Sequence, residues 1–178
     1  MQRFAPTVLS FDALESTNDY LKAKFDTLPE FTVCWAHYQH SGRGRRGHHW
    51  ESEAGKNLLF SILIKTDIIL DDMMRLVTDC LICLLESYQI HAKVKVPNDL
   101  MVNQRKIAGI LIERLFETRY LATIIGIGLN VNQTEFVSEN ATSMAIETHQ
   151  DHDLSALLTR ILDIFCQNWE SNIDNINR

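Results

Sequence analysis

Apolar positions are arranged along the chain in two ways, as near-continuous runs that predict strands and as a helical repeat that predicts helices. Residues 57–65 (NLLFSILIK) and 120–129 (YLATIIGIGL) are near-continuous apolar runs of strand length, typical of strands buried on both faces. Residues 71–89 instead place an apolar side chain every three or four positions, which predicts an amphipathic helix. The same spacing predicts a last helix over 154–172, with Asp153 placed to cap its first turn.

The first third of the chain predicts two further strands and a short helix. Residues 7–11 and the β-branched and aromatic segment 31–37 are strand candidates. A short helix over 20–25 lies between them, and the polar run 16–18 supplies N-cap candidates ahead of it. Spacing alone leaves open whether that run does more than cap the helix.

The middle of the chain predicts a small hairpin region. Residues 93–96 alternate as a half-buried strand does, and Pro97 ends the regular pairing. Two strands over 100–102 and 106–113 follow, joined by a turn at 103–105.

Strands and helices therefore mix without regular βαβ alternation, and hairpin-like connections are frequent. This order predicts a single α+β domain with a mixed, largely antiparallel sheet flanked by helices. Residues 130–150 are polar and irregular, with a short turn expected at 143–146.

Composition narrows the class of protein. The chain has 178 residues, 46% of them hydrophobic and 22% charged, which suits one soluble globular domain. The net charge of −6 argues against nucleic-acid binding. The N-terminal segment has no signal-peptide core, and no run approaches the ~20 apolar residues that span a membrane. We expect a cytoplasmic protein with no membrane partner.

The cysteines show no disulfide pattern. Cys80 and Cys83 form a C-x-x-C, but they lie in a segment with helical apolar spacing. Because cysteine often packs as a small hydrophobic residue, core packing is favoured over a redox or metal role.

One segment, 39–50 (QHSGRGRRGHHW), carries the clearest chemical signal. Its glycines make the backbone permissive, and its arginines are suited to phosphate or carboxylate. The three glycines are Gly42, Gly44 and Gly47, and the three arginines are Arg43, Arg45 and Arg46. We predict a loop that orders over an anionic ligand. A solvated turn or a loose RNA-binding segment is the alternative from this segment alone.

Four separated segments occur together in a fixed order: ESTNDYL, QHSGRGRRGHHW, KVPNDLMVNQRKIAGILIE and GIGLNVN. The ordered set, over about residues 11–131, resembles the catalytic domain of biotin protein ligases, also called biotin–[acetyl-CoA-carboxylase] ligases. The resemblance implies a fold of the class II aminoacyl-tRNA synthetase and biotin ligase type. It also implies a ligase that uses ATP and Mg²⁺ to convert biotin into biotinyl-5′-AMP. Biotin would then pass to a lysine of a biotin carboxyl carrier protein, a subunit of acetyl-CoA carboxylase.

The resemblance also implies roles for individual residues. The residues that it implies for catalysis are Lys106, Arg43, Arg45 and Asp99. Asp99 is also the candidate Mg²⁺ ligand. Nucleotide contacts fall to Arg46, Trp50, Asn98 and Asn130. Binding of biotin or its adenylate falls to Ser16, Thr17, Asn18, Gln39, Gly42, Arg43, Gly44, Arg45, Lys106, Gly109 and Gly126. The competing interpretations are helix capping for 16–18, a capped turn for Asn98 and Asp99, and a solvated lysine for Lys106.

Some features depart from the family pattern. Val96 stands where the family usually has tryptophan, which leaves the packing beside Asn98 and Asp99 in question. We expect one catalytic domain over residues 1–178, without a DNA-binding domain before Phe4 and without a C-terminal SH3-like barrel. The expected lack of a barrel keeps a second reading open, a paralogue that binds biotin or its adenylate with weak transfer. A lipoate or octanoate ligase or transferase is a third interpretation. The sequence does not fix the oligomeric state, but relatives form dimers through sheet edges, and a homodimer of this chain through an exposed edge strand stays open.

Overall fold

The computed structural model describes residues 6–65, 70–116 and 118–176. Its strands form one seven-stranded sheet in the order β1-β2-β3-β7-β6-β5-β4. β1 and β2 pair in parallel, and each other neighbouring pair is antiparallel, which confirms the predicted mixed sheet. The strands are β1 (Thr7–Phe11), β2 (Thr32–Ala36), β3 (Leu58–Ile64), β4 (Lys93–Lys95), β5 (Asp99–Val102), β6 (Arg105–Phe116) and β7 (Tyr120–Leu129).

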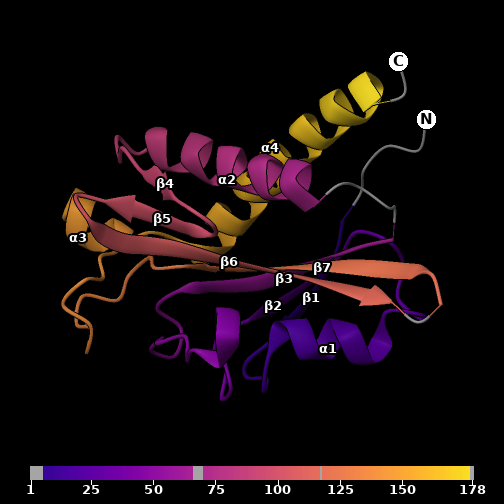
Figure 1. Ribbon diagram of the computed structural model, residues 1–178. Coiled ribbons are helices and arrows are strands. Elements are labelled where there is room, and N and C mark those ends of the chain that lie inside the picture. The colour runs from indigo at the N-terminus through magenta and orange to yellow at the C-terminus, as the bar shows by residue number, and fades with distance from the viewer. Residues whose placement is uncertain (1–5, 66–69, 117, 177–178) are drawn as a thin grey trace.

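Helices cover both faces of the sheet (Figure 1). α2 and α4 pack against each other on one face, whereas α1 lies on the other face against β2, β3 and β7. This arrangement confirms the predicted α+β architecture. The helices are α1 (Thr17–Lys24), α2 (Leu70–Glu86), α3 (Met144–Thr148) and α4 (Leu154–Ile176), and a single 3₁₀ turn η1 covers Arg45–Gly47.

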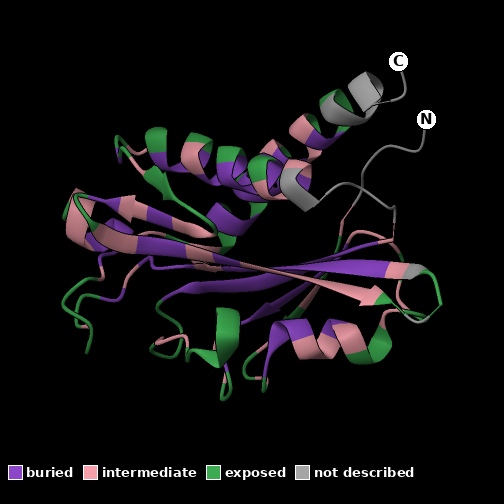
Figure 2. Ribbon diagram, viewed as in Figure 1, coloured by how far each residue is buried: buried purple, intermediate pink, exposed green. Residues whose placement is uncertain are grey.

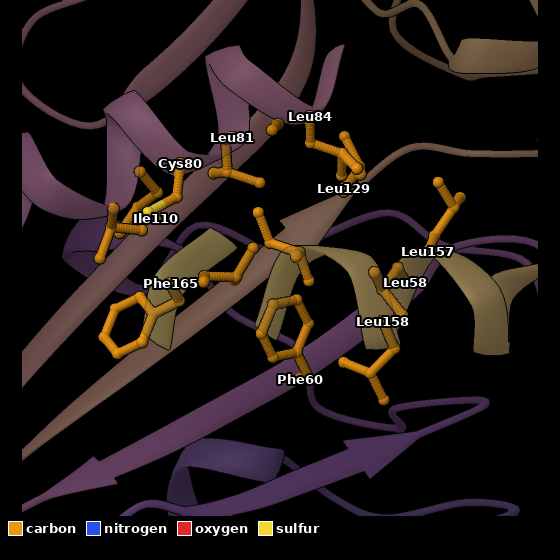
Figure 3. Packing of buried hydrophobic residues seen from close by; sticks show 14 of the residues in the cluster. Leu58, Phe60, Cys80, Leu81, Leu84, Ile110, Leu129, Leu157, Leu158 and Phe165 are labelled. Carbon is orange, nitrogen blue, oxygen red and sulfur yellow. The ribbon is translucent and has the colours of Figure 1, made fainter. Parts of the chain in front are cut away.

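The main core lies between the sheet and the α2–α4 pair. Phe60, Leu81 and Phe165 are buried there and belong to one hydrophobic cluster (Figure 3). Every residue of β3 is buried, as expected for a strand covered on both faces. Figure 2 shows the same pattern, with the central strands buried and the outer faces of the helices exposed.

Helix termini follow the expected capping chemistry. The Ser16 hydroxyl accepts a hydrogen bond from the Asp19 amide at 3.4 Å, so α1 begins at Thr17, three residues earlier than expected. Asp153 Oδ1 accepts from the Ala156 amide at 2.9 Å and caps α4 as predicted. The short turn expected at 143–146 is the start of α3, which Ser143 caps.

The edge strand β4 corrects one expectation. Its three residues are exposed rather than half-buried, because β4 is the last strand of the sheet and pairs with β5 alone. Val96, which follows it, is 83% exposed. The tryptophan position of the family pattern therefore faces solvent here, and the position of Asp99 depends on β5–β6 pairing instead.

The C-x-x-C prediction holds for one cysteine and not for the other. Cys80 is buried in the core, and burial raises the pKa of its thiol to about 12. Cys83 is exposed on the same helix. Over the described ranges, no helix is both long enough and apolar enough to cross a membrane. The expectation about a DNA-binding segment before Phe4 concerns residues outside the described ones.

Truncation of Phe60 tests the core. Phe60→Ala is expected to lower the free energy of unfolding by about 3–5 kcal/mol, because it removes a fully buried ring and leaves a cavity. Urea unfolding followed by circular dichroism measures the change. Val137→Ala is the control, since Val137 is 92% exposed and its change should stay within about 0.5 kcal/mol. Equal changes in the two variants would contradict this account of the core.

Candidate active site

A cavity of about 310 Å³ lies beside the N-terminus of α1 and brings the four sequence segments together. α1 supplies Ser16, Thr17 and Asn18, and strands β6 and β7 supply the cavity wall. Of the predicted site residues, those that line it are Ser16, Thr17, Asn18, Gln39, Arg43, Gly44, Arg45, Trp50, Asn98, Asp99, Lys106, Gly109 and Gly126.

Three predicted site residues lie elsewhere. Gly42 is buried behind Gln39, where an added Cβ would come within 3.2 Å of Gln39 Nε2. Arg46 is exposed, has a left-handed φ of 57°, and lines neither this cavity nor its neighbour. Asn130 lines a second, adjoining cavity instead.

Glycines on β6 and β7 make room for the protein's own side chains. Gly109 and Gly128 face each other in the sheet, and the Trp50 indole lies over both. A Cβ at Gly128 would lie 2.6 Å from Trp50 Cε2, and one at Gly109 would lie 2.8 Å from Trp50 Cζ3. A Cβ at Gly126 would lie 2.3 Å from Asn18 Oδ1. The space over Gly109 and Gly126, two of the implied binding residues, is therefore taken up by Trp50 and Asn18.

A chain of hydrogen bonds orders one wall of the cavity. Ser61 Oγ donates to Asn18 Oδ1 at 2.6 Å and lies 2.6 Å from Thr17 Oγ1. The Thr17 amide donates to Gln39 Oε1 at 2.8 Å. Gln39 Nε2 has no hydrogen-bond partner among the described residues, so this amide remains a donor for a ligand. The polar run 16–18 thus both caps α1 and lines the cavity.

Arg43 is tied to two carboxylates beside the cavity. Its guanidinium makes a two-point contact with Asp19 and also lies 3.3 Å from Glu113 Oε2. The hydrogen bond from Arg43 holds the pKa of Asp19 below its usual value. Burial alone would raise the pKa of Glu113, but hydrogen bonds from Lys22 and Asn18 outweigh it and lower that pKa. Arg43 therefore anchors the 39–50 loop to α1 and β6.

The sequence predictions did not include Asp19 and Glu113. Both lie within segments that carried the family resemblance, Asp19 in ESTNDYL and Glu113 at the end of ILIE. Arg45 differs from Arg43: it is exposed at the cavity and has no ion pair with any residue that the structure describes. Its guanidinium is available to an anionic ligand.

A second cavity, of about 280 Å³, adjoins the first across a shared wall. The shared residues are His49, Trp50, Asp99 and Lys106. Lys106 Nζ lies 2.7 Å from Asp99 Oδ1 and 5.1 Å from the centroid of the Trp50 ring. The ion pair and the indole together mark the junction of the two spaces.

Backbone contacts fix this junction. The Lys106 amide donates to the Asn140 carbonyl at 2.7 Å, and the Thr142 amide donates to the Lys106 carbonyl at 2.9 Å. Asn130 Nδ2 donates to the Thr142 carbonyl at 3.0 Å, while Asn130 Oδ1 is buried without a hydrogen-bond partner. Asn130 therefore holds the segment that follows Lys106 through its Nδ2, while its Oδ1 is enclosed by the protein.

Asn98 is also held by the backbone. Its Nδ2 donates to the Ile110 carbonyl at 3.0 Å, and its carbonyl accepts from the Ile110 amide at 2.9 Å. The structure thus shows the turn-fixing role for Asn98, in a residue that also lines the first cavity. Within the described part of the chain, no group of three or more His, Cys, Asp or Glu side chains is placed to hold a metal ion.

Comparison with known proteins fits this geometry. The family model described as "Biotin/lipoate A/B protein ligase family" matches residues 10–130, which hold the loop, Lys106 and both glycine-bearing strands. The chain belongs to this family.

Individual members of the biotin/lipoate ligase family are similar over much of the chain. The bifunctional ligase/repressor BirA of Escherichia coli is 32% identical over 198 residues, which cover 97% of this chain and 61% of BirA. The BirA of Bacillus spizizenii is 31% identical over 150 residues, which cover 79% of this chain and 46% of that protein. This chain therefore corresponds to about half to three fifths of these relatives.

A solved family member has the same fold. The biotin protein ligase of Aquifex aeolicus, determined in complex with biotin and ATP, superposes with a TM-score of 0.79 at 29% identity. The match covers 92% of this chain and 70% of the Aquifex chain. This agreement confirms the fold that the sequence resemblance implied.

Gly128→Ala tests whether the glycines of β6 and β7 make room for the Trp50 indole. The added methyl group would overlap the indole of Trp50, which must then leave the sheet surface. We expect a red shift of tryptophan fluorescence, because the displaced Trp50 indole becomes more exposed to solvent. Trp35 and Trp169 are buried, so their contribution to the spectrum should stay constant. Gly44→Ala is the control, since its Cβ would meet nothing closer than 3.7 Å. An unshifted spectrum for Gly128→Ala would contradict the placement of the Trp50 indole over Gly128.

Acidification tests the carboxylates that hold Arg43. A carboxyl with a lowered folded-state pKa stabilises the fold above its ordinary pKa, and this stabilisation is lost as pH falls through the lowered value. The free energy of unfolding should therefore decline from about pH 5 to about pH 3. Asp19→Asn should show a shallower decline in urea unfolding, because one titrating group is gone. Parallel curves for the two proteins would contradict the assignment.

Proposed function

We propose that this chain joins biotin to a carrier lysine through a biotinyl-adenylate. The junction of the two cavities at Lys106 and Asp99 carries the proposal, since it places one fixed cation between a ligand pocket and a second space open to a nucleotide. Family membership and the biotin and ATP bound to the Aquifex relative support it.

The first cavity suits the ring system of biotin. Its wall includes Gln39, whose Nε2 has no partner among the described residues, next to Thr17 and Asn18, while the Trp50 ring supplies apolar surface. A cyclic urea offers both a carbonyl acceptor and N–H donors to such a wall. A dithiolane ring offers neither, and it would leave polar groups of the wall without partners, which costs about 1–3 kcal/mol for each buried group. This contrast favours biotin over lipoate.

In the first step, a carboxylate oxygen of biotin attacks the α-phosphorus of ATP. A new O–P bond forms, and the bond to pyrophosphate breaks. Lys106 stabilises the negative charge that develops between carboxylate and phosphate. Arg45 supplies a second cation at the cavity, and Arg43 holds the loop that bears it.

In the second step, a carrier lysine attacks the carbonyl carbon of the anhydride. The C–N bond forms, AMP leaves, and the amine loses a proton. Asp99, at the junction, is placed to orient this incoming amine.

The nucleotide occupies the second cavity in this proposal. Asn130 lines this cavity, and the indole of Trp50 forms part of the shared wall. Magnesium, when bound, supplies positive charge to the phosphates. Asp99 is the carboxylate that would hold it, since Mg²⁺ is commonly bound by one or two carboxylates together with phosphate oxygens. Arg46, also predicted to contact the nucleotide, is exposed on the 39–50 loop and lines neither cavity.

The partner is a biotin carboxyl carrier domain, because transfer requires a lysine acceptor. Association of two copies is also proposed, through a sheet edge. β1 and β4 are the edge strands, and exposed edges of this kind pair readily with another strand.

Pyrophosphate release tests the reaction. With ATP, magnesium and biotin, we expect pyrophosphate release that depends on biotin, followed by biotinylation of an added carrier domain. Lys106→Ala should lower the rate by roughly 100-fold or more, because a charge that acts on the transition state is removed. Substitution of the exposed Lys24→Ala, on the far end of α1, should leave the rate unchanged.

The alternatives give different results in the same assay. Biotin binding without pyrophosphate release would indicate a binding protein. Release that depends on lipoate or octanoate rather than biotin would indicate the other branch of the family. Either result would overturn the proposed reaction.

A further inference from the structure

Glu113 connects elements that are far apart in the sequence, although it does not line either cavity. Its carboxylate accepts from Asn18 Nδ2 at 2.6 Å and from Lys22 Nζ at 2.5 Å. The same carboxylate lies 3.3–3.4 Å from Arg43 on the loop. One residue of β6 therefore contacts the ligand-facing end of α1 and the anchor of the 39–50 loop.

The contact with Asn18 fixes which way its amide faces. A carboxylate only accepts hydrogen bonds, so the Nδ2 end of Asn18 must face Glu113. The Oδ1 end then faces Ser61 Oγ, which must donate to it. The Thr17 hydroxyl must then donate to Ser61 Oγ, which leaves the Thr17 oxygen as an acceptor in a residue that lines the cavity. The Thr17 backbone amide separately holds Gln39 Oε1.

The contact with Arg43 fixes the loop. Asp19 and Glu113 hold one guanidinium between them, so two carboxylates neutralise a cation that would otherwise repel Arg45 and Arg46. Gly126 permits this arrangement, because any side chain there would displace Asn18 from the strand. The Glu113 carboxylate therefore both orients the Asn18 amide and anchors Arg43 of the loop.

We propose that Glu113 is a positioning residue that couples closure of the 39–50 loop to the hydrogen-bonding pattern that recognises the ligand. Biotin as the ligand rests on the proposed function. Coupling of the loop to Glu113 does not, since it rests on contacts within the chain itself.

Trypsin measures the loop, because Arg45 and Arg46 are exposed cleavage sites within it. In the empty protein, Glu113→Gln should speed cleavage after these residues by roughly fivefold to tenfold, since a charged partner of Arg43 is lost. Mass spectrometry of the fragments identifies the cut. Unchanged cleavage in Glu113→Gln overturns the proposal, whether or not the protein binds biotin.

Calorimetry with biotin measures the effect of Glu113 on ligand recognition. Glu113→Gln should bind biotin about tenfold more weakly, because one amide oxygen replaces the two carboxylate oxygens that Asn18 and Arg43 contact. Biotin should also protect the loop from trypsin in the wild type, and this protection should be much smaller in the variant. Loss of thermal stability alone would not change the ratio of cleavage rates with and without biotin.

Two variants separate positioning from general stability. Lys22→Met breaks an ion pair of Glu113 but keeps its contacts with Asn18 and Arg43, so affinity and cleavage should stay within about twofold of wild type. Asp19→Asn should speed cleavage but weaken biotin binding less than Glu113→Gln does, because Asp19 holds Arg43 but not Asn18. If Lys22→Met reproduces both effects of Glu113→Gln, the proposal is overturned in favour of a plain stability effect. A wild type that fails to bind biotin would instead count against the proposed function, and cleavage of the empty protein would still decide the loop coupling.

Discussion

The active-site face depends on the absence of side chains at a few positions in the centre of the sheet. Gly109 and Gly128 face each other on β6 and β7, and the Trp50 indole occupies the space above them. Gly126, two residues along β7, gives the same room to Asn18. Because successive strand residues point to opposite faces, the isoleucines beside these glycines pack into the core while the glycines face the cavity. One strand pair thus provides a packed core on one side and a hollow on the other.

The positively charged residues around that cavity have two roles: one anchors the loop, and another remains available to a ligand. Arg43 is neutralised by Asp19 and Glu113, which lets a loop rich in positive charge lie against the protein without a ligand. Arg45 has no such partner among the described residues and remains at the cavity. Lys106 is intermediate, since Asp99 pairs with it but both groups remain partly exposed at the junction. The loop is therefore held in place by Arg43 and can bind an anion through Arg45.

The junction of the two cavities gives the proposed reaction its geometry. A carboxylate from the first cavity and a phosphate from the second would meet beside Lys106, with Trp50 forming part of both walls. The segment that pairs with the Lys106 backbone holds this lysine from the other side, through Asn140 and Thr142. The position of the cation is therefore set by backbone hydrogen bonds as well as by its side-chain partner.

The sequence by itself determined the elements that depend on local spacing. Near-continuous apolar runs predicted β3 and β7, and apolar side chains every three or four residues predicted α2 and α4. The ordered motifs predicted the family and most of the cavity lining. Only the tertiary structure decided how distant residues meet. Exposure of β4 depends on its place at the sheet edge, and the contacts of Glu113 depend on strand register, which brings together residues about 70 to 95 positions apart. Local sequence fixes which face a side chain points to, whereas its partners depend on which element packs over that face.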